Sequence, residues 1–473
     1  MAVAVTSGCG DEATDVAAPA GDAGAAGGAD AAGAGGAAAS AGAVAATGGA
    51  VNTTGVRLTP SAIAPGWGRT CVVLVQGEVK CWGENGGGFL GLGDSEHRGD
   101  DPGEMGDALP AVDLGTGAVA VAVTSGLHHE CAVLADGAVK CWGGNYSGEL
   151  GLGDIERRGD DPDGMGDGLP TVDLGTGRTA TAVTVGISHS CALLDNRSVK
   201  CWGGNNVGQL GLGDADSRGD EPGEMGDQLP AVDLGTGRTA TALSSNDSHT
   251  CALLDDGSVK CWGRNGAGQL GRGDTDPRGD DPDEMGDHLP PIDLGSGRTA
   301  LAVSTGSQHC CALLDDGSVK CWGADGGRLG LGDIEGRGDD PGEMGDQLPP
   351  VDLGTGATAV AMSAGAHHAC AILTTGAIKC WGAGDYGTLG NGGQTVVGRS
   401  PDEMGDALAP VDVGSGVQPT VVAASLQISC VGFSQGQLKC WGGNQYGQLG
   451  LGDTEDRGDA PGEMGDALPF IEL

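Results

Sequence analysis

Basic residues are scarce in this chain, and so are long hydrophobic segments. The 473 residues include 24 Lys and Arg against 65 Asp and Glu, which gives a formal net charge of −41 at pH 7. A surface of that sign repels the phosphate groups of nucleic acids, so we expect no nucleic-acid partner. No uninterrupted apolar run reaches the roughly 18 residues that a transmembrane helix needs. Contact with a membrane would therefore require a lipid anchor.

Aromatic residues are also few, at 3% of the chain. Apart from one recurring tryptophan motif, the aromatic residues are Trp67, Phe89, Tyr146, Tyr386, Phe433, Tyr446 and Phe470. A protein that grips its partner tightly, such as a secreted enzyme inhibitor, would be expected to present aromatic anchors on one face. The scarcity of aromatic side chains therefore favours polar or electrostatic recognition.

Sequence signatures of catalysis are missing. The chain has no G-x-S-x-G turn, no phosphate-binding loop and no H-E-x-x-H motif. The residues that do recur are equivalent in every repeat, whereas an enzyme usually needs a unique, asymmetric cluster. We predict that the protein is not an enzyme and uses no cofactor. The alternative is an active site assembled from different loops at a central channel.

The motif Cys-Trp-Gly recurs seven times along the chain. It begins at Cys81, Cys141, Cys201, Cys261, Cys321, Cys380 and Cys440, with spacings of 60, 60, 60, 60, 59 and 60 residues. Seven repeat units therefore cover residues 56–473. Their approximate bounds, used below for units one to seven, are 56–117, 118–177, 178–237, 238–297, 298–356, 357–416 and 417–473.

The segment before the repeats has a different composition. Residues 10–55 consist almost entirely of small and polar residues, with no Lys or Arg before Arg57. Such a segment cannot bury enough apolar area to offset its ordering entropy, so we predict a disordered Ala/Gly-rich linker. Residues 1–9 end in Ser-Gly-Cys, which resembles the end of a bacterial lipoprotein signal whose beginning is missing. Cys9 is then a candidate lipid-attachment site. Alternatively, the segment is a strand fragment, because Ala2–Gly8 is identical to Ala120–Gly126.

Each unit contains four segments that are typical of short β-strands. In unit four they are residues 239–245, 249–254, 258–263 and 290–294. These segments are rich in apolar and β-branched residues, and none has the 3.6-residue period of an amphipathic helix. Seven units of four short strands predict an all-β, seven-bladed β-propeller. A parallel β-helix is the structural alternative, but its repeats are normally far shorter than 60 residues.

Three recurring motifs resemble those of one known family. They are G-x-x-H-[ST] (Gly186 to Ser190), V-K-C-W-G, and G-Q-L-G-x-G-D (Gly208 to Asp214). They are similar to the repeats of the regulator of chromosome condensation family, which form seven-bladed propellers. The resemblance implies a fold but no single function. Family members include a nuclear guanine-nucleotide exchange factor, a plant ultraviolet photoreceptor and a secreted β-lactamase inhibitor.

A pair of cysteines ten residues apart occurs in every unit. The pairs are Cys71/Cys81, Cys131/Cys141, Cys191/Cys201, Cys251/Cys261, Cys311/Cys321, Cys370/Cys380 and Cys430/Cys440. If 255–257 is a three-residue loop, Cys251 lies opposite Cys261 in a close, non-hydrogen-bonded strand pair, at disulfide distance. Seven disulfides need an oxidising compartment, so we expect an exported protein. Metal binding and reduced core cysteines are the alternatives. Cys310 has no partner at this spacing.

Histidine precedes the first cysteine of five pairs by two residues. These histidines are His129, His189, His249, His309 and His368, and Arg69 and Ile428 stand at the equivalent positions of units one and seven. The functional interpretation is a ring of imidazoles that binds a metal or moves protons. We favour a structural role, in which each histidine hydrogen-bonds the backbone of a neighbouring blade. The tryptophan of each Cys-Trp-Gly motif is expected to pack between blades.

An acidic insert follows the Gly-rich loop of each unit. In unit four, Asp274, Asp276, Asp280 and Asp281 are candidate calcium ligands, since a calcium loop has carboxylates at alternate positions before a glycine. Arg278 stands where a third ligand belongs and brings its own positive charge. We therefore favour a turn held by an arginine–carboxylate pair, with a solvated acidic loop as the third alternative. Unit six departs from this pattern at residues 391–406, so its loop is expected to differ.

These observations lead to one functional hypothesis and two alternatives. The hypothesis is a non-enzymatic, monomeric binding or scaffold module, exported to a bacterial cell envelope, which presents an acidic propeller surface to an unknown protein. The alternatives are a guanine-nucleotide exchange factor for a small GTPase and a secreted enzyme inhibitor. An exchange factor would have to act in the cytosol, where disulfides do not normally persist.

Overall fold

Short antiparallel strands make up the regular structure of residues 62–473, the part of the chain that the computed structural model describes. They form seven separate three-stranded sheets, in which sequential strands are neighbours. The sheets are β1 (Ile63–Pro65), β2 (Arg69–Val73) and β3 (Val79–Gly83); β4 (Ala120–Ser125), β5 (His129–Leu134) and β6 (Val139–Gly143); β7 (Ala180–Val185), β8 (His189–Leu194) and β9 (Val199–Gly203); β10 (Ala240–Asn246), β11 (His249–Leu254) and β12 (Val259–Gly263); β13 (Ala300–Thr305), β14 (His309–Leu314) and β15 (Val319–Gly323); β16 (Ala359–Ala364), β17 (His368–Leu373) and β18 (Ile378–Gly382); β19 (Pro419–Ala424), β20 (Ile428–Phe433) and β21 (Leu438–Gly442). The predicted leader, Cys9 and the predicted linker lie outside the described residues.

Helical structure in the described residues is limited to single turns of 3-10 helix in the loops. These turns are η2 (Gly106–Ala108), η3 (Pro162–Gly164), η4 (Gly166–Gly168), η5 (Gly226–Gln228), η6 (Gly286–His288), η7 (Gly345–Gln347), η8 (Asp385–Gly387), η9 (Pro401–Glu403), η10 (Gly405–Ala407) and η11 (Gly465–Ala467). None of them is long and apolar enough to cross a membrane.

The tight turn between the second and third strand sets the register of each sheet. In unit four, Gly257 has a φ of 79°, a conformation that glycine adopts without a steric penalty. The turn is closed by backbone hydrogen bonds from Leu254 to Ser258 and from Gly257 back to Leu254. With this turn in place, Leu253 pairs with Val259 and Cys251 pairs with Cys261. The structure confirms the predicted register.

The predicted fourth strand of each unit is not a strand. In unit four, the backbone N–H of Ile292 donates to the Val259 carbonyl, which is one hydrogen bond of the kind that pairs strands. The preceding residues, Pro290 and Pro291, have no N–H to donate. The next carbonyl along the turn, that of Gly257, already accepts a hydrogen bond from Ala300 of unit five. No further ladder bond forms along this segment, although Ile292 and Leu294 are still buried and complete the core.

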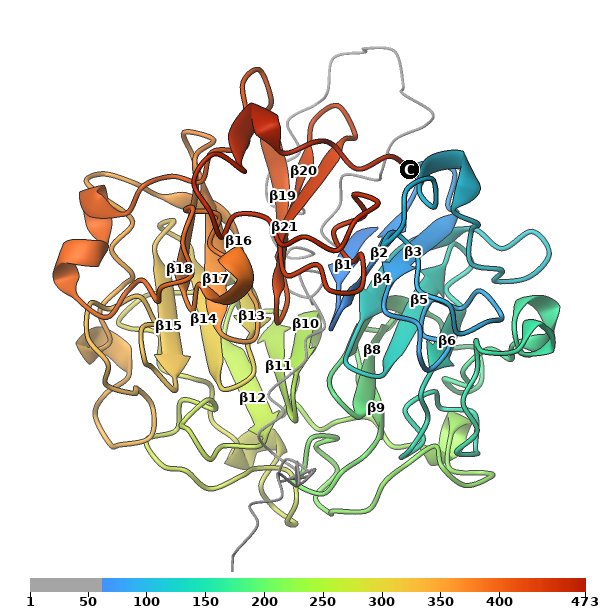
Figure 1. The fold of residues 1–473 in the computed structure, drawn as a ribbon. Helices are drawn as coiled ribbons and strands as arrows, with labels where there is room; N and C mark the ends of the chain where they lie inside the picture. The colour runs from blue at the N-terminus through green and yellow to red at the C-terminus, as the bar shows by residue number, and fades with distance from the viewer. Residues whose placement is uncertain (1–61) are drawn as a thin grey trace, which may run out of the picture.

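The seven sheets are arranged around a common centre, and the ring closes between unit seven and unit one (Figure 1). Within unit seven the backbone N–H of Ile471 donates to the carbonyl of Leu438, and across the closure the N–H of Gly106 in unit one donates to the carbonyl of Glu472. Ile63, Trp82 and Ile471 share one hydrophobic cluster with residues of β20 and β21. The fold is a closed, all-β propeller with seven blades, and an open β-helix is excluded.

The hydrophobic core is divided into clusters that each join two successive units. Trp262 of unit four, for example, packs with Leu210, Val232 and Leu234 of unit three, over the Cys191–Cys201 pair. All seven Cys-Trp-Gly tryptophans are fully buried. Each indole N–H donates to a backbone carbonyl of the preceding unit, as Trp262 does to Gln209 at 3.1 Å. At the closure, Trp82 of unit one donates to Gln448 of unit seven.

We predict that the last residues of the chain stabilise the ring. Ile471 is 7% exposed and fills the closing cluster, so Ile471→Ala should lower the free energy of unfolding by about 2–5 kcal/mol. Glu472→Ala is the matched control, because the Glu472 side chain is exposed and its backbone carbonyl is retained. Urea unfolding followed by tryptophan fluorescence measures both changes. Equal effects of the two substitutions would contradict a closing role for Ile471.

Candidate functional site

A disulfide joins the second and third strand of every sheet. The bonds are Cys71–Cys81, Cys131–Cys141, Cys191–Cys201, Cys251–Cys261, Cys311–Cys321, Cys370–Cys380 and Cys430–Cys440. The paired Cα atoms lie 4.0–4.1 Å apart, the short distance of a non-hydrogen-bonded antiparallel pair. All fourteen cysteines are buried between units. Each bond closes a short loop and contributes up to about 3 kcal/mol by restricting the unfolded chain.

Cys310 is a free cysteine in the described part of the chain, and it is buried. It belongs to β14, next to Cys311, whose side chain points to the opposite face of the sheet and pairs with Cys321. Burial raises the pKa of the Cys310 thiol, so the thiol stays protonated at neutral pH.

Three of the five repeated histidines link neighbouring units through side chains, whereas neither ring nitrogen of His309 has a hydrogen-bond partner. The Nε2 atoms of His129, His189 and His368 lie 2.8 Å from the hydroxyls of Ser190, Thr250 and Ser429 in the following unit. We expected a backbone partner, and this expectation was wrong. The hydroxyl in turn donates to a backbone carbonyl of the preceding unit, as the Ser190 hydroxyl does to the carbonyl of Glu149.

Burial keeps these imidazoles neutral. It lowers the pKa of His189, His249 and His368 to about 3, and that of His129 well below its usual value. An uncharged, buried ring that spans two units acts as a structural link. The pKa values do not suit proton transfer near neutral pH.

An ion pair replaces the histidine–hydroxyl link between units one and two. Arg69 and Glu130 occupy the two equivalent positions, and both side chains are fully buried. The Arg69 guanidinium bonds the Glu130 carboxylate and also donates to the carbonyls of Gly126 and Leu127. The repeat pattern marks Arg69 as a substitution but does not by itself indicate its partner. Glu130, the only acidic residue at the hydroxyl position of any unit, was the signal that could have revealed it.

Each regular acidic insert is folded around one arginine. In unit four, Arg278 donates to the Asp274 carboxylate at 2.6 Å and to two backbone carbonyls of the same loop. The same pair occurs in five other units as Asp94–Arg98, Asp154–Arg158, Asp214–Arg218, Asp333–Arg337 and Asp453–Arg457. In unit six, Gly393 and Val397 stand at these positions, so this pair is missing there.

The candidate calcium ligands do not converge. Within residues 62–473, the one group of three or more His, Cys, Asp or Glu residues with ligand atoms within 4.8 Å is His249, Cys251 and Cys310. Asp274, Asp276, Asp280 and Asp281 are not part of such a group. Asp274 is also engaged by Asn265 and by its own turn. The arginine therefore occupies the place that a cation would take.

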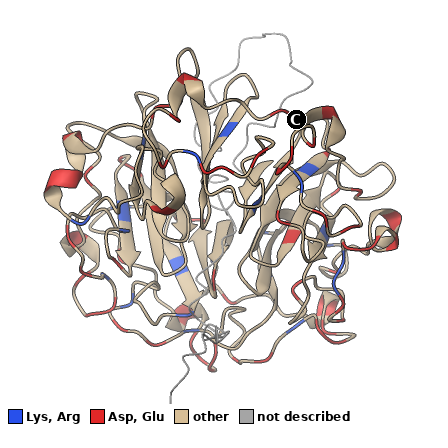
Figure 2. Ribbon diagram, viewed as in Figure 1, with Lys and Arg blue, Asp and Glu red and all other residues tan. Residues whose placement is uncertain are grey.

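Carboxylates without an arginine partner cover the outer loops of the ring (Figure 2). At the junction of units six and seven they line a cavity of 440 Å³, together with the side chain of Tyr386. Its acidic residues are Glu455, Asp456, Asp459 and Glu463. Partial burial and the neighbouring carboxylates raise the pKa of Asp456. We call this cavity the acidic groove.

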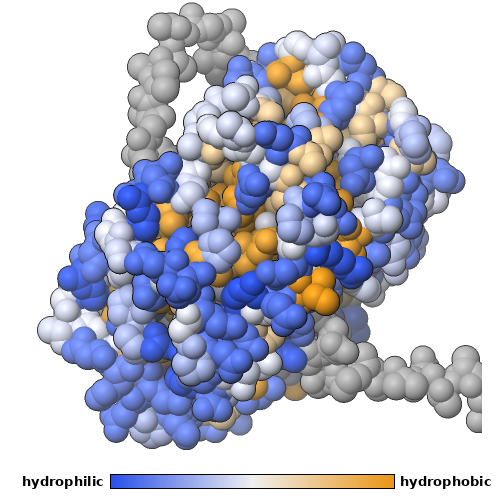
Figure 3. Space-filling view, turned by 90° about the vertical axis from the view of Figure 1, so that its left-hand side faces the viewer, coloured by the Kyte–Doolittle hydropathy of each residue, from blue (hydrophilic) through white to orange (hydrophobic). Residues whose placement is uncertain are grey.

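A second cavity of 530 Å³ lies beside the irregular loop of unit six. Its wall includes Asn391, Val396, Val397 and Met464. Asn391 and Val397 stand at the positions that Leu451 and Arg457 occupy in unit seven, so the altered loop coincides with this cavity. On the side of the molecule that lies to the left in Figure 1, hydrophobic residues form small patches among hydrophilic ones (Figure 3).

The fold and the repeated cores define a propeller built from disulfide-linked repeats. A family model described as the regulator of chromosome condensation (RCC1) repeat matches residues 120–149, 180–209, 240–269, 301–326 and 359–388. A second model of the same description matches residues 256–313. The chain belongs to the RCC1-repeat family.

Known proteins with related sequences perform different tasks. The chain is 29% identical over 343 residues to the ultraviolet-B receptor UVR8 of Arabidopsis thaliana, covering 71% of this chain and 68% of the receptor. It is 31% identical over 342 residues to the human E3 ubiquitin-protein ligase HERC2, covering 72% of this chain but 6% of the ligase.

Solved structures share the propeller fold. Yeast RCC1 (Prp20), solved in complex with Kap60, has a TM-score of 0.61 and 19% identity, covering 81% of this chain and 82% of that chain. Human WBSCR16 has a TM-score of 0.57 and 18% identity, covering 76% of this chain and 82% of that chain. At these identities the likeness concerns the fold alone.

We predict that calcium does not stabilise the acidic inserts specifically. Because Arg278 already holds Asp274, millimolar Ca²⁺ should change the melting temperature no more than Mg²⁺ or matched ionic strength does. Differential scanning calorimetry in the three solutions provides the measurement. A calcium-specific rise of many degrees, abolished by Asp274→Asn combined with Asp276→Asn, would overturn this interpretation.

We also predict that buried Glu149 lowers the stability of the folded protein at high pH. Burial raises its pKa from 4.5 to about 7, so the stability it contributes is present below pH 4.5 and is lost as the pH rises through about 7. Units three, four and seven have Gln209, Gln269 and Gln448 at this position. Glu149→Gln should therefore match the wild type at pH 4 and be more stable by up to about 3 kcal/mol at pH 8. The reciprocal Gln209→Glu variant should lose stability over the same pH range. Urea unfolding at both pH values tests the pair, and two parallel pH profiles would refute the assignment.

Proposed function

We propose that this protein is a non-enzymatic binding module of the cell envelope, whose acidic outer loops recognise a basic protein. The observation that carries the proposal is the surplus of unpaired carboxylates on the rim. Each regular insert contains one paired arginine, while most of its acidic side chains have no basic partner. The chain has 65 acidic and 24 basic residues in total. A surface of one sign attracts a partner of the opposite sign and accelerates the encounter.

The acidic groove is the proposed contact point for cationic side chains. It combines four carboxylates with the ring of Tyr386, which is 38% exposed. A lysine or arginine of the partner could pair with the carboxylates and lie against the aromatic ring. Tyr386 has a φ of 60°, an uncommon conformation for a residue other than glycine. The groove lies at the junction of units six and seven, and its lining residues come from both units.

The seven disulfides support the envelope location in this proposal. Seven buried disulfides are compatible with an oxidising compartment and would not normally persist in a reducing cytosol. Attachment through a lipid on Cys9 would keep the propeller at the membrane while its acidic loops remain in water. The same disulfides argue against the alternative of a cytosolic exchange factor. The few exposed aromatic side chains argue against a tight-binding inhibitor.

The proposal predicts a salt-sensitive protein partner in an envelope extract. The purified propeller, immobilised, should capture a basic protein at low ionic strength and release it as salt screens the charges. The double variant Glu455→Gln/Asp459→Asn should weaken capture several-fold. The matched control Asp216→Asn/Glu221→Gln removes the same charge from exposed positions of unit three and should have little effect.

Two results would contradict the proposal. One is equal capture of the partner by the two double variants, which would show that the acidic groove takes no part in binding. The other is a non-reducing peptide map of the protein isolated from its native location in which all fourteen paired cysteines are alkylated as free thiols. That map would place the protein in a reducing compartment and would favour the exchange-factor alternative. We expect seven bridges, with Cys310 free.

A further inference from the structure

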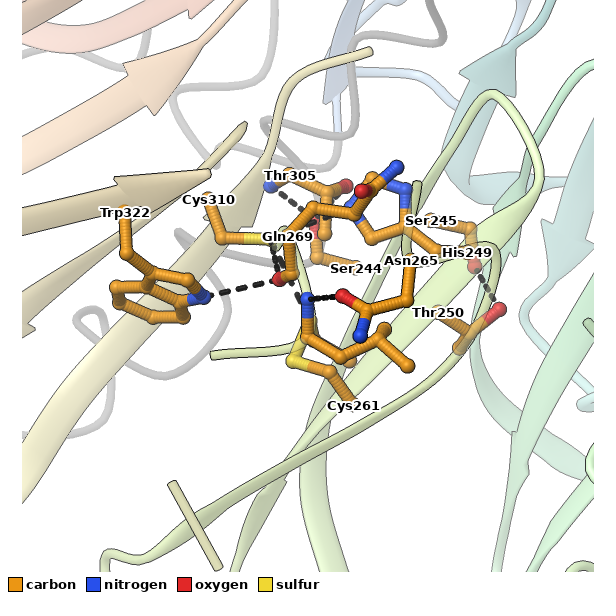
Figure 4. Close-up of a disulfide and its surroundings, with 12 residues drawn as sticks. Ser244, Ser245, His249, Thr250, Cys261, Asn265, Gln269, Thr305, Cys310 and Trp322 are labelled. Carbon is orange, nitrogen blue, oxygen red and sulfur yellow. Dashed lines mark hydrogen bonds between the residues drawn. A yellow bond between two sulfur atoms is a disulfide. The ribbon is translucent and has the colours of Figure 1, made fainter. Parts of the chain in front are cut away.

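The junction between units four and five brings together two sulfur atoms and an imidazole nitrogen. Cys310 of β14 and His249 of β11 are drawn in Figure 4, and Cys251 of β11 also contacts Cys310. Its Sγ is 3.2 Å from His249 Nε2 and 3.8 Å from Cys251 Sγ. All three side chains are buried.

Equivalent junctions contain the same arrangement with oxygen in place of sulfur. Between units three and four, His189 Nε2 lies 2.8 Å from the Thr250 hydroxyl, and Cys191 Sγ lies 3.8 Å from it. Ser190 and Ser429 occupy the corresponding places at two other junctions. Only the junction of units four and five has a thiol at this position among the described units. The thiol of Cys310 therefore distinguishes this junction from those that have a hydroxyl at the same position.

The separations match those of a tetrahedral metal site. With Zn–S bonds of about 2.3 Å and a Zn–N bond of about 2.0 Å, two sulfur ligands lie about 3.8 Å apart, and a nitrogen and a sulfur about 3.5 Å apart. The observed values are 3.8 Å and 3.2 Å. The three ligand atoms all lie within 4.8 Å of one another. Small side-chain shifts would place one ion at bonding distance from each atom.

The charges of the ligands also suit a buried cation. His249 is neutral, because burial lowers its pKa to about 3, and a metal binds the neutral ring. Binding through Nε2 places the ring proton on Nδ1. Two thiolates balance the charge of a divalent ion, so the complex carries no net charge in its apolar surroundings. Soft sulfur and imidazole donors select Zn²⁺ or Cu⁺ over Ca²⁺ or Mg²⁺.

The Cys251–Cys261 disulfide controls access to this site, because a sulfur in a disulfide is not a thiolate ligand. We propose that reduction of this disulfide converts the junction into a site for Zn²⁺ or a similar thiophilic cation, bound by His249, Cys251 and Cys310. In the reduction, a dithiol or phosphine supplies two electrons to the S–S bond, and two protons complete the thiols. Each thiol that binds the ion then releases its proton to water, and the oxidation state of the ion does not change.

The two states would connect different parts of the ring. The disulfide joins β11 to β12 within unit four, whereas the metal joins β11 of unit four to β14 of unit five. Before oxidation, or in a reducing compartment, a metal could thus clamp two blades together. The stabilisation follows from binding to the folded state alone. This inference does not depend on the partner or on the acidic groove.

The variant Cys261→Ser tests the site without reducing the other six disulfides. It frees Cys251 and leaves His249, Cys251 and Cys310 as potential ligands. Under anaerobic conditions it should bind one equivalent of Co²⁺, with thiolate-to-cobalt charge-transfer absorption that Zn²⁺ abolishes. Zn²⁺ should also raise its melting temperature.

Cys201→Ser in unit three is the matched control. It frees Cys191 beside His189 but offers the hydroxyl of Thr250 in place of a thiol. Loss of even an outer partner of a metal ligand costs about 10–100-fold in affinity, so the control should bind at least about tenfold more weakly. Cys261→Ser/Cys310→Thr should behave like the control.

Equal metal affinity in Cys261→Ser and Cys201→Ser would overturn the proposal, as would complete formation of a Cys251–Cys310 disulfide in the presence of Zn²⁺. If Cys261→Ser does not fold, wild type and Cys310→Thr are compared after full reduction by a phosphine in the presence of Co²⁺. The wild type should bind one more equivalent of Co²⁺ tightly than Cys310→Thr does. Identical titrations of the two chains would equally refute the site.

Discussion

The contact between successive units is the interaction on which the whole ring depends. A single three-stranded sheet of short strands cannot bury both of its faces, so each unit must be covered by the next. The Cys-Trp-Gly tryptophan performs this role, since its ring packs into the preceding unit and its N–H satisfies a backbone carbonyl there. The lysine of the same strand adds a second link, as Lys260 donates to Leu234 of unit three and to Gly286 of its own unit. One strand thus supplies the apolar and the polar contacts of the junction.

Repetition makes single substitutions at these junctions informative. Because the framework around them is equivalent, a change of one side chain alters the local chemistry while the backbone geometry is kept. The pair Arg69 and Glu130 replaces a neutral link by a buried ion pair, and Cys310 replaces a hydroxyl by a thiol. Both changes required side chains from two units that are far apart in the sequence and adjacent in the ring. Chemistry that is unique in this protein is therefore found at the junctions and in the irregular loop of unit six.

The acidic surface is separated from this framework. The carboxylates are concentrated in the outer loops, where water and the insert arginines moderate their mutual repulsion (Figure 2). The core can therefore remain nearly the same in all units while the loops change in charge and shape. Unit six illustrates this freedom, since its insert lacks the arginine–aspartate pair but its strands and its disulfide are those of the other units.

The sequence by itself determined the number of blades, the positions of three strands in each unit and their pairing register, because all of these follow from local patterns repeated seven times. The ten-residue cysteine spacing placed Cys251 opposite Cys261 once the Gly257 turn was recognised. Only the tertiary structure decided which residues of different units touch. It showed that the Gly257 carbonyl bonds Ala300 of the next unit, that His129, His189 and His368 reach hydroxyls, and that His249, Cys251 and Cys310 converge. These contacts join residues about 40 to 60 positions apart, and their geometry depends on the angle between blades, which no local pattern contains.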